Sequence, residues 1–385
     1  MNPAHCCEGI WRIPVSLVQG VVVASDFIRS DRHGVPGEGD RSAVWVFDAV
    51  KRQVEKAANL PVTLLTAGTC PGLRSWVEAQ RTAEQADAFW AANYDRLAVD
   101  AALEGVLLRP IRRHFVIGHE MPPYLRTILA EHGVPYLDIR IHPIRFLDDL
   151  LFAVQASESE TQAALLNIAV SEETVLAAAG LIEAMCRYTA DCTLAANTLL
   201  VIGQRTMDSS QIIGGRFFDA LSRLPEIRSL CDRYSGVLLK AHPYGGHHSL
   251  LLAAAAVPNV LAATSDNVYR LLAQPEIGGV LTVNSSSAYE ARYFGKRVHT
   301  LASLPVDIAW RGEAAPPGSY ISLDDYLLSV DFWRLALRAC ANVGRMTDVR
   351  LPPKPNRIRI AHDSFWNFHE IDTDRIPRSS KAVAC

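Results

Sequence analysis

The chain has 385 residues, of which 49% are hydrophobic and 21% charged, and a formal net charge of −3. This composition indicates a globular protein with enough chain for two domains, and it excludes a disordered chain. The near-neutral charge argues against a general affinity for nucleic acid, because nucleic-acid-binding domains usually carry a basic surface.

The first half of the chain alternates between apolar runs and segments with helical spacing. Strands are expected at 15–25, 61–68, 114–120 and 135–141, and helices at 42–59, 75–98 and 122–133. Gly133 closes the last of these helices, as a glycine commonly does. Strands separated by helices of this length predict right-handed crossovers and a parallel sheet. The segment 157–196 has helical spacing and no strand pattern.

A second alternation begins near Asn197. Its expected strands are 199–203, 236–241, 259–265, 278–283 and 297–303, and its expected helices are 215–234, 248–257, 267–275 and 287–295. A further helix is expected at 324–343, and the tail beyond residue 351 is expected to be irregular.

The order of elements predicts an α/β fold of two Rossmann-like, doubly wound domains facing across a cleft. The expected N-terminal domain is 1–196, with a helical extension, and the second domain is 197–323. The C-terminal segment, 324–385, is expected to pack back on the N-terminal domain.

Targeting and membrane signals are not recognisable in this sequence. No run of about 18 apolar residues lacks charge, and the N-terminus lacks the basic start and apolar core of a secretory signal. We therefore expect a cytoplasmic protein. A peripheral association with the inner membrane is the alternative, and Trp310 and the aromatic patch 365–368 are the candidates for contact with the membrane or with a partner. Buried packing is the favoured interpretation of both.

Eight cysteines occur at irregular spacing and are interpreted as reduced thiols. Cys186 and Cys192 lack the close ligand pairs of a structural zinc site, so a metal site there is not favoured.

Three polar clusters follow expected strands of the second half. They are QRTMDSS (204–210) after LLVIG, His242-Pro243 after GVLLKA, and NSSSAYE (284–290) after GGVLTV. Ligands of open parallel sheets bind beyond the carboxyl ends of the strands. We therefore expect the three clusters to form one site.

The first cluster contains a carboxylate with two interpretations. Asp208 precedes two serines and can cap the following turn. Alternatively, it faces a bound sugar, with Gln204, Arg205 and Ser210 around it. A nearby arginine favours the charged form of a carboxylate.

The second cluster suits an anionic ligand. Pro243 ends the strand, and His242 is expected to point into the crevice and donate a hydrogen bond to a phosphate oxygen. Lys240 adds a positive charge beside it. The alternative is a histidine that only satisfies loop carbonyls.

The third cluster crosses from a strand to a helix. Ser285, Ser286 and Ser287 offer hydroxyl and backbone N–H groups at the start of the helix, which is typical of an anion site. Ser287 and Glu290 also have capping-box spacing. Capping competes with a second role for Glu290, which is to accept hydrogen bonds from a ribose.

Polar residues also end the strands of the first half. Glu120 is a candidate base for an acceptor hydroxyl, with His119 as the alternative. Asp138, Arg140 and Arg145 are candidates for binding the acceptor, a carboxylate or a phosphate. For each of these residues taken singly, a structural role is the favoured alternative.

The combination of G-Q-x(3)-D-x-S (203–210), K-A-H-P (240–243) and N-S-S-S-A-Y-E-A-x(3)-G-K-x-V (284–298) resembles bacterial β-Kdo transferases of capsule and lipopolysaccharide synthesis. Both the KpsC-like and the O-antigen-capping types are similar to it. The resemblance implies a GT-B-like glycosyltransferase that moves Kdo, with retention, from CMP-β-Kdo to a polysaccharide or lipid-linked acceptor.

By position, the resemblance implies Asp208 as the nucleophile and His242 as a phosphate contact. It also implies that the Ser285–Ser287 turn and Glu290 hold the cytidine monophosphate. The resemblance transfers poorly to the first half. No DxD-like metal dyad lies in a suitable loop, so no metal and no cofactor are expected. The alternatives are another CMP-sugar transferase, of the sialyltransferase type, and a non-catalytic scaffold that binds nucleotide sugars.

Overall fold

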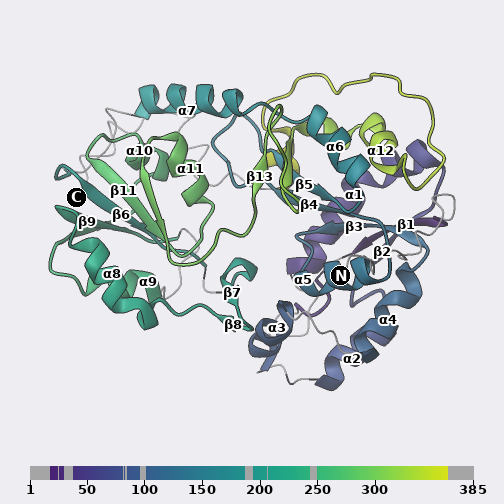
Figure 1. Ribbon diagram of the computed structural model, residues 1–385, viewed down its shortest axis with the longest axis horizontal. Helices are drawn as coiled ribbons and strands as arrows, with labels where there is room; N and C mark the ends of the chain where they lie inside the picture. Colours follow the sequence, from purple (N-terminus) through teal and green to yellow (C-terminus); the bar gives the residue numbers. More distant parts are fainter. Residues whose placement is uncertain are drawn as a thin grey trace, which may run out of the picture. The chain divides into compact units, whose positions relative to one another are not determined.

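The computed structural model describes residues 18–24, 26–29, 38–80, 82, 85–95, 101–186, 194–205, 207–242 and 249–362. Two compact units divide the chain. Unit 1 comprises Met1–Ile139, Val154–Leu165 and Tyr326–Leu351, and unit 2 comprises Arg140–Ala153, Leu166–Asp325 and Pro352–Cys385. Both contain parallel strands and helices (Figure 1), so the predicted α/β class is confirmed. The domain boundaries predicted after residues 196 and 323 stay a prediction.

The larger sheet has the strand order β13-β14-β5-β4-β3-β1-β2. Its strands are β1 (Gly20–Ala24), β2 (Val62–Leu65), β3 (His114–His119), β4 (Tyr136–Ile141), β5 (Phe152–Ala156), β13 (Ile308–Ala309) and β14 (Tyr320–Leu323). Strand β1 is parallel to both β2 and β3, and its residues Val21–Val23 are at most 2% exposed. A run of buried β-branched residues is typical of a strand covered on both faces.

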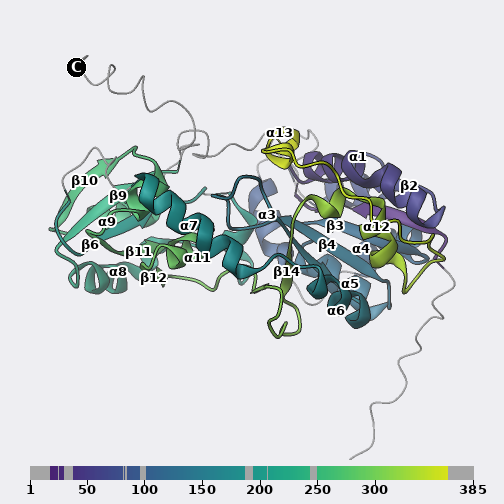
Figure 2. The same cartoon turned by 90° about the horizontal axis from the view of Figure 1, so that it is seen from above.

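Among the described residues, the helices of unit 1 are α1 (Glu38–Ala58), α2 (Pro71–Gln80), α3 (Ala86–Tyr94), α4 (Ala101–Ile111), α5 (Pro123–Glu131), most of α6 (Ser159–Asn167) and α12 (Val330–Leu337). Helix α1 contacts β1, β2 and β3, and it packs along α12 (Figure 2). The single helix predicted at 75–98 is wrong, because α2 and α3 share that span. Helix α4 was not predicted; Pro110 lies in its last turn, where it obscures the helical pattern.

Unit 2 contains a five-stranded parallel sheet of order β10-β9-β6-β11-β12. Its strands are β6 (Thr198–Ile202), β9 (Gly236–Lys240), β10 (Val260–Thr264), β11 (Ile277–Thr282) and β12 (Arg297–Thr300). The chain proceeds outward from β6 to β9 and β10, and then returns to the other side of β6 for β11 and β12. The strand order therefore reverses between β6 and β11, which is where doubly wound sheets bind ligands.

Helices cover both faces of the five-stranded sheet (Figure 1). Helices α7 (Glu172–Cys186), α10 (Val268–Leu272) and α11 (Ser287–Tyr293) lie on one face, and α8 (Leu224–Cys231) and α9 (Ser249–Ala255) lie on the other. Along β6, Leu200 and Ile202 belong to the first core, and Leu199 and Val201 belong to the second. This alternation follows from the two-residue period of a strand, and it confirms the predicted doubly wound arrangement.

The helix predicted at 215–234 is wrong in its first half. Gly214 and Gly215 have φ angles of 58° and 77°, and they turn the antiparallel hairpin of β7 (Ile212–Ile213) and β8 (Arg216–Phe217). A 3-10 turn at Ala220–Arg223 then leads into α8. Glycines with positive φ favour a hairpin over a helix.

The tail beyond residue 351 contains a helix, α13 (Arg357–His362), so the predicted irregularity is wrong for these residues, and the tail beyond His362 lies outside the described residues. Within unit 2, Arg359 is fully buried and donates hydrogen bonds to the carbonyls of Arg145 and Leu147, at 2.5 and 2.8 Å. Its backbone N–H also donates to Asp149 Oδ1 at 3.1 Å. These bonds order a segment whose own sequence shows little helical spacing.

Trp310 is 5% exposed, and its ring centroid lies 5.2 Å from that of His142, so the buried interpretation is confirmed. The patch 365–368 and Cys192 lie outside the described residues. Cys70, Cys186, Cys231 and Cys340 are free thiols, as predicted. Over the described ranges no single helix is long and apolar enough to cross a bilayer, although α6 and α7, bent by 48°, reach that length and composition together.

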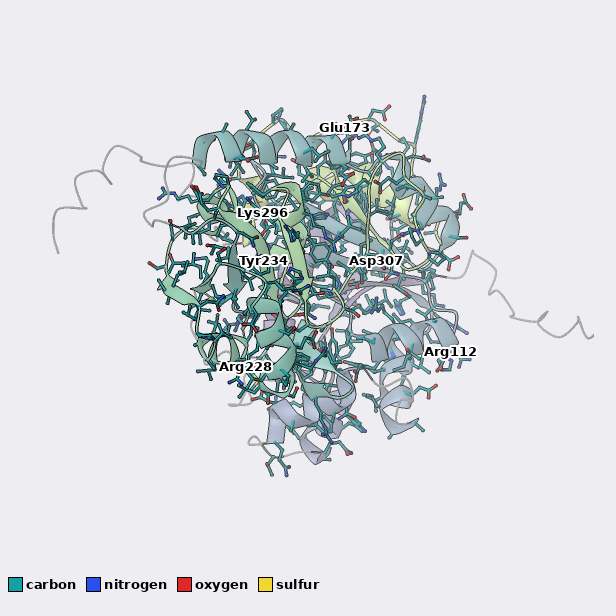
Figure 3. All side chains as sticks on the ribbon, turned by 60° about the vertical axis from the view of Figure 1, so that its left-hand side comes forward. Arg112, Glu173, Arg228, Tyr234, Lys296 and Asp307 are labelled. Carbon is teal, nitrogen blue, oxygen red and sulfur yellow. The ribbon has the colours of Figure 1, made fainter. Side chains whose placement is uncertain are left out.

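Gly279 in β11 is expected to tolerate no side chain. A Cβ atom there would lie 2.3 Å from the Oη of Tyr234 (labelled in Figure 3), which is itself 2.7 Å from His299 Nε2. Gly279→Ala is therefore expected to lower the free energy of unfolding by about 1–3 kcal/mol in urea titrations. In the control Gly180→Ala, in α7, the new Cβ meets nothing within 4 Å, and stability is expected to rise by about 0.5–1 kcal/mol. Equal effects of the two changes would contradict the steric argument.

Candidate functional site

The candidate site lies at the carboxyl ends of the strands in unit 2, on both sides of the reversal between β6 and β11. Gln204, Arg205 and Asp208 follow β6, and Asn284 and the Ser285–Ser287 turn follow β11. Strands β6 and β11 pair directly, so the first and third predicted clusters lie at neighbouring strand ends.

A pair of buried amides joins these two clusters. Gln204 Nε2 donates to Asn284 Oδ1 at 3.1 Å, and the Asn284 backbone N–H donates to Gln204 Oε1 at 2.8 Å. The Thr282 hydroxyl also donates to Gln204 Oε1, at 3.2 Å. Gln204 is 9% exposed and Asn284 is 3% exposed. Gln204, which we predicted to contact the donor, thus links the two loops.

Asp208 caps the 3-10 turn Ser209–Gln211, as one of its two interpretations predicts. Its Oδ1 accepts hydrogen bonds from the backbone N–H and the hydroxyl of Ser210, at 2.9 and 2.7 Å. The side chain is half-buried, and within the described ranges its Oδ2 makes no hydrogen bond. The backbone carbonyl of Arg205 accepts a bond from Gln211 Nε2, which closes the loop.

The Ser285–Ser287 turn begins α11. The hydroxyls of Ser285 and Ser287 lie 3.3 Å apart, and Ser285 Oγ also accepts a bond from the Ser287 N–H. Ser286 is the N-cap residue, but its side chain makes no capping bond. The capping box predicted for Ser287 and Glu290 is therefore wrong, because the Glu290 carboxylate points elsewhere.

Glu290 Oε1 accepts hydrogen bonds from the Arg145 backbone N–H at 2.8 Å and from Tyr269 Oη at 2.9 Å. The side chain is 3% exposed. Burial raises the pKa of this carboxyl to about 7, against the opposing effects of these two bonds and of the Arg145 and Arg359 charges. Its contacts tie α11 to α10 and to the segment after β4, and they offer no hydrogen bond to a ribose.

The end of β9 supplies a buried cation. Lys240 is 5% exposed, and its Nζ donates to the Asp266 carbonyl at 2.5 Å. Asp266 follows β10, so this bond joins two more strand ends. His242 is half-buried two residues after β9, and Pro243 lies outside the described residues. The second predicted cluster therefore begins at the carboxyl edge of the same sheet.

Two of the predicted residues belong to unit 1: Glu120 directly follows β3, and Asp138 lies in β4. Glu120 has a φ of 48°, an uncommon left-handed backbone for a glutamate, and its N–H donates to the Ile139 carbonyl at 2.9 Å. Such strained backbone is frequent at functional sites. Asp138 is fully buried, and its Oδ1 accepts a bond from the Met121 N–H at 2.8 Å. Asp138 thus fixes the turn after β3, and its position gives no support to contact with an acceptor.

The two predicted arginines belong to unit 2. Arg140 Nε donates to Tyr320 Oη at 3.1 Å, and its guanidinium lies 5.2 Å from the centre of that ring. Arg145 is half-buried, next to the Glu290 contact. Nearby, His142 is fully buried, and burial lowers its pKa to about 3, so this imidazole is neutral at pH 7.

Asp26 and Asp266 are polar residues at strand ends for which the sequence predicted no role, and Asn284 was predicted only as part of the third cluster, without a role of its own. In unit 1, Asp26 Oδ2 accepts a bond from Trp90 Nε1 at 2.8 Å and Oδ1 from Tyr124 Oη at 3.1 Å, while burial raises the Asp26 pKa. The rule that ligands bind at carboxyl ends, applied to the strands ending near residues 25 and 265, would have found Asp26 and Asp266.

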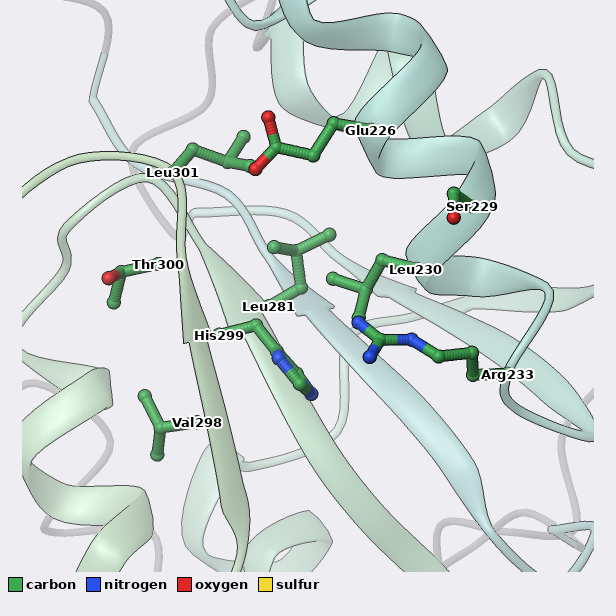
Figure 4. Close-up of a pocket in the computed structure, with 9 residues that line it drawn as sticks. All are labelled: Glu226, Ser229, Leu230, Arg233, Leu281, Val298, His299, Thr300 and Leu301. Carbon is green, nitrogen blue, oxygen red and sulfur yellow. The ribbon is translucent and has the colours of Figure 1, made fainter.

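A cavity of about 550 Å³ lies beside β12 (Figure 4). It is lined by Glu226, Ser229, Leu230, Arg233, Leu281, Val298, His299, Thr300 and Leu301. None of the predicted site residues that the structure describes lines it. We therefore place the candidate site by the polar contacts between strand ends and not by this cavity.

In the part of the chain that the structure describes, no three His, Cys, Asp or Glu side chains are grouped so that they could hold a metal ion. Metal independence stays a prediction.

No protein-family model matches this sequence, and no curated protein matches it. Among solved structures, the chain is similar to two from Thermosulfurimonas dismutans KpsC. The beta Kdo 2,7 transferase matches at 15% identity and a TM-score of 0.33, over 63% of this chain and 81% of the other. The beta Kdo 2,4 transferase matches at 13% identity and a TM-score of 0.38, over 84% and 90%. The sequence identities and the TM-scores are both low, so the candidate site is located from its own residues and their contacts.

Proposed function

We propose that this protein is a glycosyltransferase that moves an acidic sugar, Kdo, from CMP-β-Kdo to a glycan acceptor. One observation carries the proposal. The Gln204–Asn284 amide pair joins the loop that holds Asp208 to the Ser285–Ser287 turn, at the strand reversal of unit 2. A carboxylate and an anion-binding turn at one sheet edge suit a sugar linked to a phosphate. The resemblance of the three sequence motifs to β-Kdo transferases supports the choice of donor.

The donor carries two negative charges next to each other, the Kdo carboxylate and the phosphate. We assign the hydroxyl groups of the Ser285–Ser287 turn, together with His242, to the phosphate. Lys240 and Arg205 supply positive charge at the same edge. CMP leaves as an anion, so donors preorganised at the phosphate stabilise the transition state. Glu290 is not assigned to the ribose, because its carboxylate is 3% exposed and bonded within unit 2.

The proposed reaction is a double displacement with retention. Asp208 Oδ2 attacks the anomeric carbon, the bond from that carbon to the phosphate oxygen breaks, and CMP departs with the electron pair. The acceptor hydroxyl then attacks the same carbon, a base takes its proton, and the Asp208 carboxylate is released. The Ser210 bonds to Oδ1 hold the carboxylate so that Oδ2 faces the sugar. Glu120 as the base, and Arg140 and Arg145 as contacts for acidic groups, stay proposals.

The test compares two CMP-sugars. CMP-Kdo should be turned over, by hydrolysis or by transfer to an added glycan, at least about 100-fold faster than CMP-sialic acid, since the pocket must discriminate the sugar ring. Release of CMP from each donor measures this, and NMR of the product gives its anomeric configuration. Preference for CMP-sialic acid would assign a sialyltransferase instead. Tight CMP binding with no turnover of either donor would assign a binding scaffold. An inverted product would exclude the covalent intermediate.

A further inference from the structure

The side-chain amide of Asn284 lies at the centre of a polar network that ends on Asp208. Its Oδ1 accepts the bond from Gln204 Nε2, and its Nδ2 donates to the carbonyls of Ser210 and Ser303, at 2.6 and 3.2 Å. An asparagine amide has two N–H donors, and both are used. Ser210 in turn supplies both hydrogen bonds to Asp208 Oδ1.

The orientation of the two amides is fixed by their partners. Turning the Asn284 amide over would place its oxygen against two carbonyl oxygens and its nitrogen against the nitrogen of Gln204. Gln204 cannot compensate by turning as well, because its Oε1 already accepts from Thr282 and from the Asn284 backbone. The two buried amides therefore satisfy all of these hydrogen bonds in one orientation only. Removing one amide leaves the buried groups that bond to it without a partner.

We propose that Asn284 is a positioning residue for Asp208. Through the Ser210 carbonyl it fixes the 3-10 turn that holds the Asp208 carboxylate, and through Gln204 it sets that turn relative to the Ser285–Ser287 turn. The proposal rests on the proposed function, in which Asp208 attacks a donor whose phosphate lies at those serines. A misplacement of about 1 Å of a reacting group can lower the rate about 100-fold.

The first test replaces one donor group and keeps the shape. Asn284→Asp retains an oxygen that accepts from Gln204 but places a second oxygen against the carbonyls of Ser210 and Ser303. We expect kcat for CMP-Kdo to fall about 100-fold while KM changes less than about three-fold. The matched control is Asn259→Asp in the same unit. Asn259 Nδ2 also donates to two carbonyls, those of Cys231 and Tyr234, but at the other end of the strands. The kcat of Asn259→Asp for CMP-Kdo is expected to stay within about three-fold of the parent value.

The second test does not need activity. The N–H groups of Ser210 and Gln211 bond to Asp208, at its Oδ1 and its carbonyl. Their hydrogen exchange should be at least about ten-fold faster in Asn284→Asp and unchanged in Asn259→Asp, because only the first loosens the turn. If Asn284→Asp does not fold, Asn284→Ser, which is neutral and shorter, is used in the same two tests.

Unchanged exchange at Ser210 and Gln211 would overturn the positioning role, and so would fast exchange with a normal kcat. If Asp208→Asn is itself fully active, the nucleophile role proposed for Asp208 fails, and the exchange result alone then decides whether Asn284 holds the turn. If the parent turns over no CMP-sugar, the proposed function itself fails. Equal losses of kcat in Asn284→Asp and Asn259→Asp would also overturn the proposal, since they would mark a general loss of stability.

Discussion

Asp208→Asn should lower kcat for transfer from CMP-Kdo by at least about 10³-fold, because it removes the nucleophile. An asparagine Oδ1 still accepts the two bonds from Ser210, so the turn should keep its shape. The amide that replaces Oδ2 does not attack the anomeric carbon. Binding of CMP, measured by calorimetry, should therefore stay within about three-fold of the parent. This combination separates the chemical role of Asp208 from its capping role.

The matched control for Asp208 is Asp219. Asp219 also caps a 3-10 turn in unit 2, and its Oδ1 accepts from the Leu221 N–H at 3.0 Å. Replacing Asp219 by Ala removes a cap and should cost about 1 kcal/mol of stability while kcat changes little. If Asp208→Asn kept more than about a tenth of the parent kcat, Asp208 would be a capping residue of the same kind as Asp219, and the covalent intermediate would be excluded.

The five-stranded sheet was predictable because its strands are apolar runs that start and stop sharply. All five of its strands overlap the predicted ranges, and the polar clusters lie at their carboxyl ends as expected. The strands that were missed, β5, β13 and β14, follow turns or are very short, and a strand of two residues such as Ile308–Ala309 shows no alternation. The hairpin at Gly214-Gly215 was missed because the apolar residues around it also suit a helix.

The roles inside the site were harder to predict than its location. Position alone placed Gln204 and Glu290 near a ligand, but both are buried and bond to other parts of unit 2. Their partners, Asn284 and the Arg145 N–H, lie 80 and 145 residues away in sequence. Local spacing carries no information about such contacts, and the capping-box pattern at Ser287 pointed to a different partner for the same carboxylate.

The buried Glu290 carboxyl makes stability depend on pH. Its pKa is raised from the ordinary value of 4.5 to about 7, chiefly because burial disfavours the charged form. Tyr269, Arg145 and Arg359 face it, and the Tyr269 pKa is itself raised well above 10, so that hydroxyl stays neutral. Between pH 4.5 and 7 the folded protein thus holds a proton that the unfolded chain has lost. The free energy of unfolding must fall as pH rises through this window.

Glu290→Gln should remove this dependence, since the amide does not titrate and its oxygen can still accept from Arg145 and Tyr269. Relative to the parent, the variant should gain stability by up to about 3 kcal/mol between pH 5 and pH 8, from the difference between pKa values of 4.5 and about 7. Urea unfolding followed by circular dichroism at four pH values measures the difference. Glu226→Gln, at an exposed glutamate of α8, should vary by less than about 0.5 kcal/mol over the same range. Parallel curves for Glu290→Gln and the parent would mean that Arg145 and Arg359 keep the carboxylate ionised despite its burial.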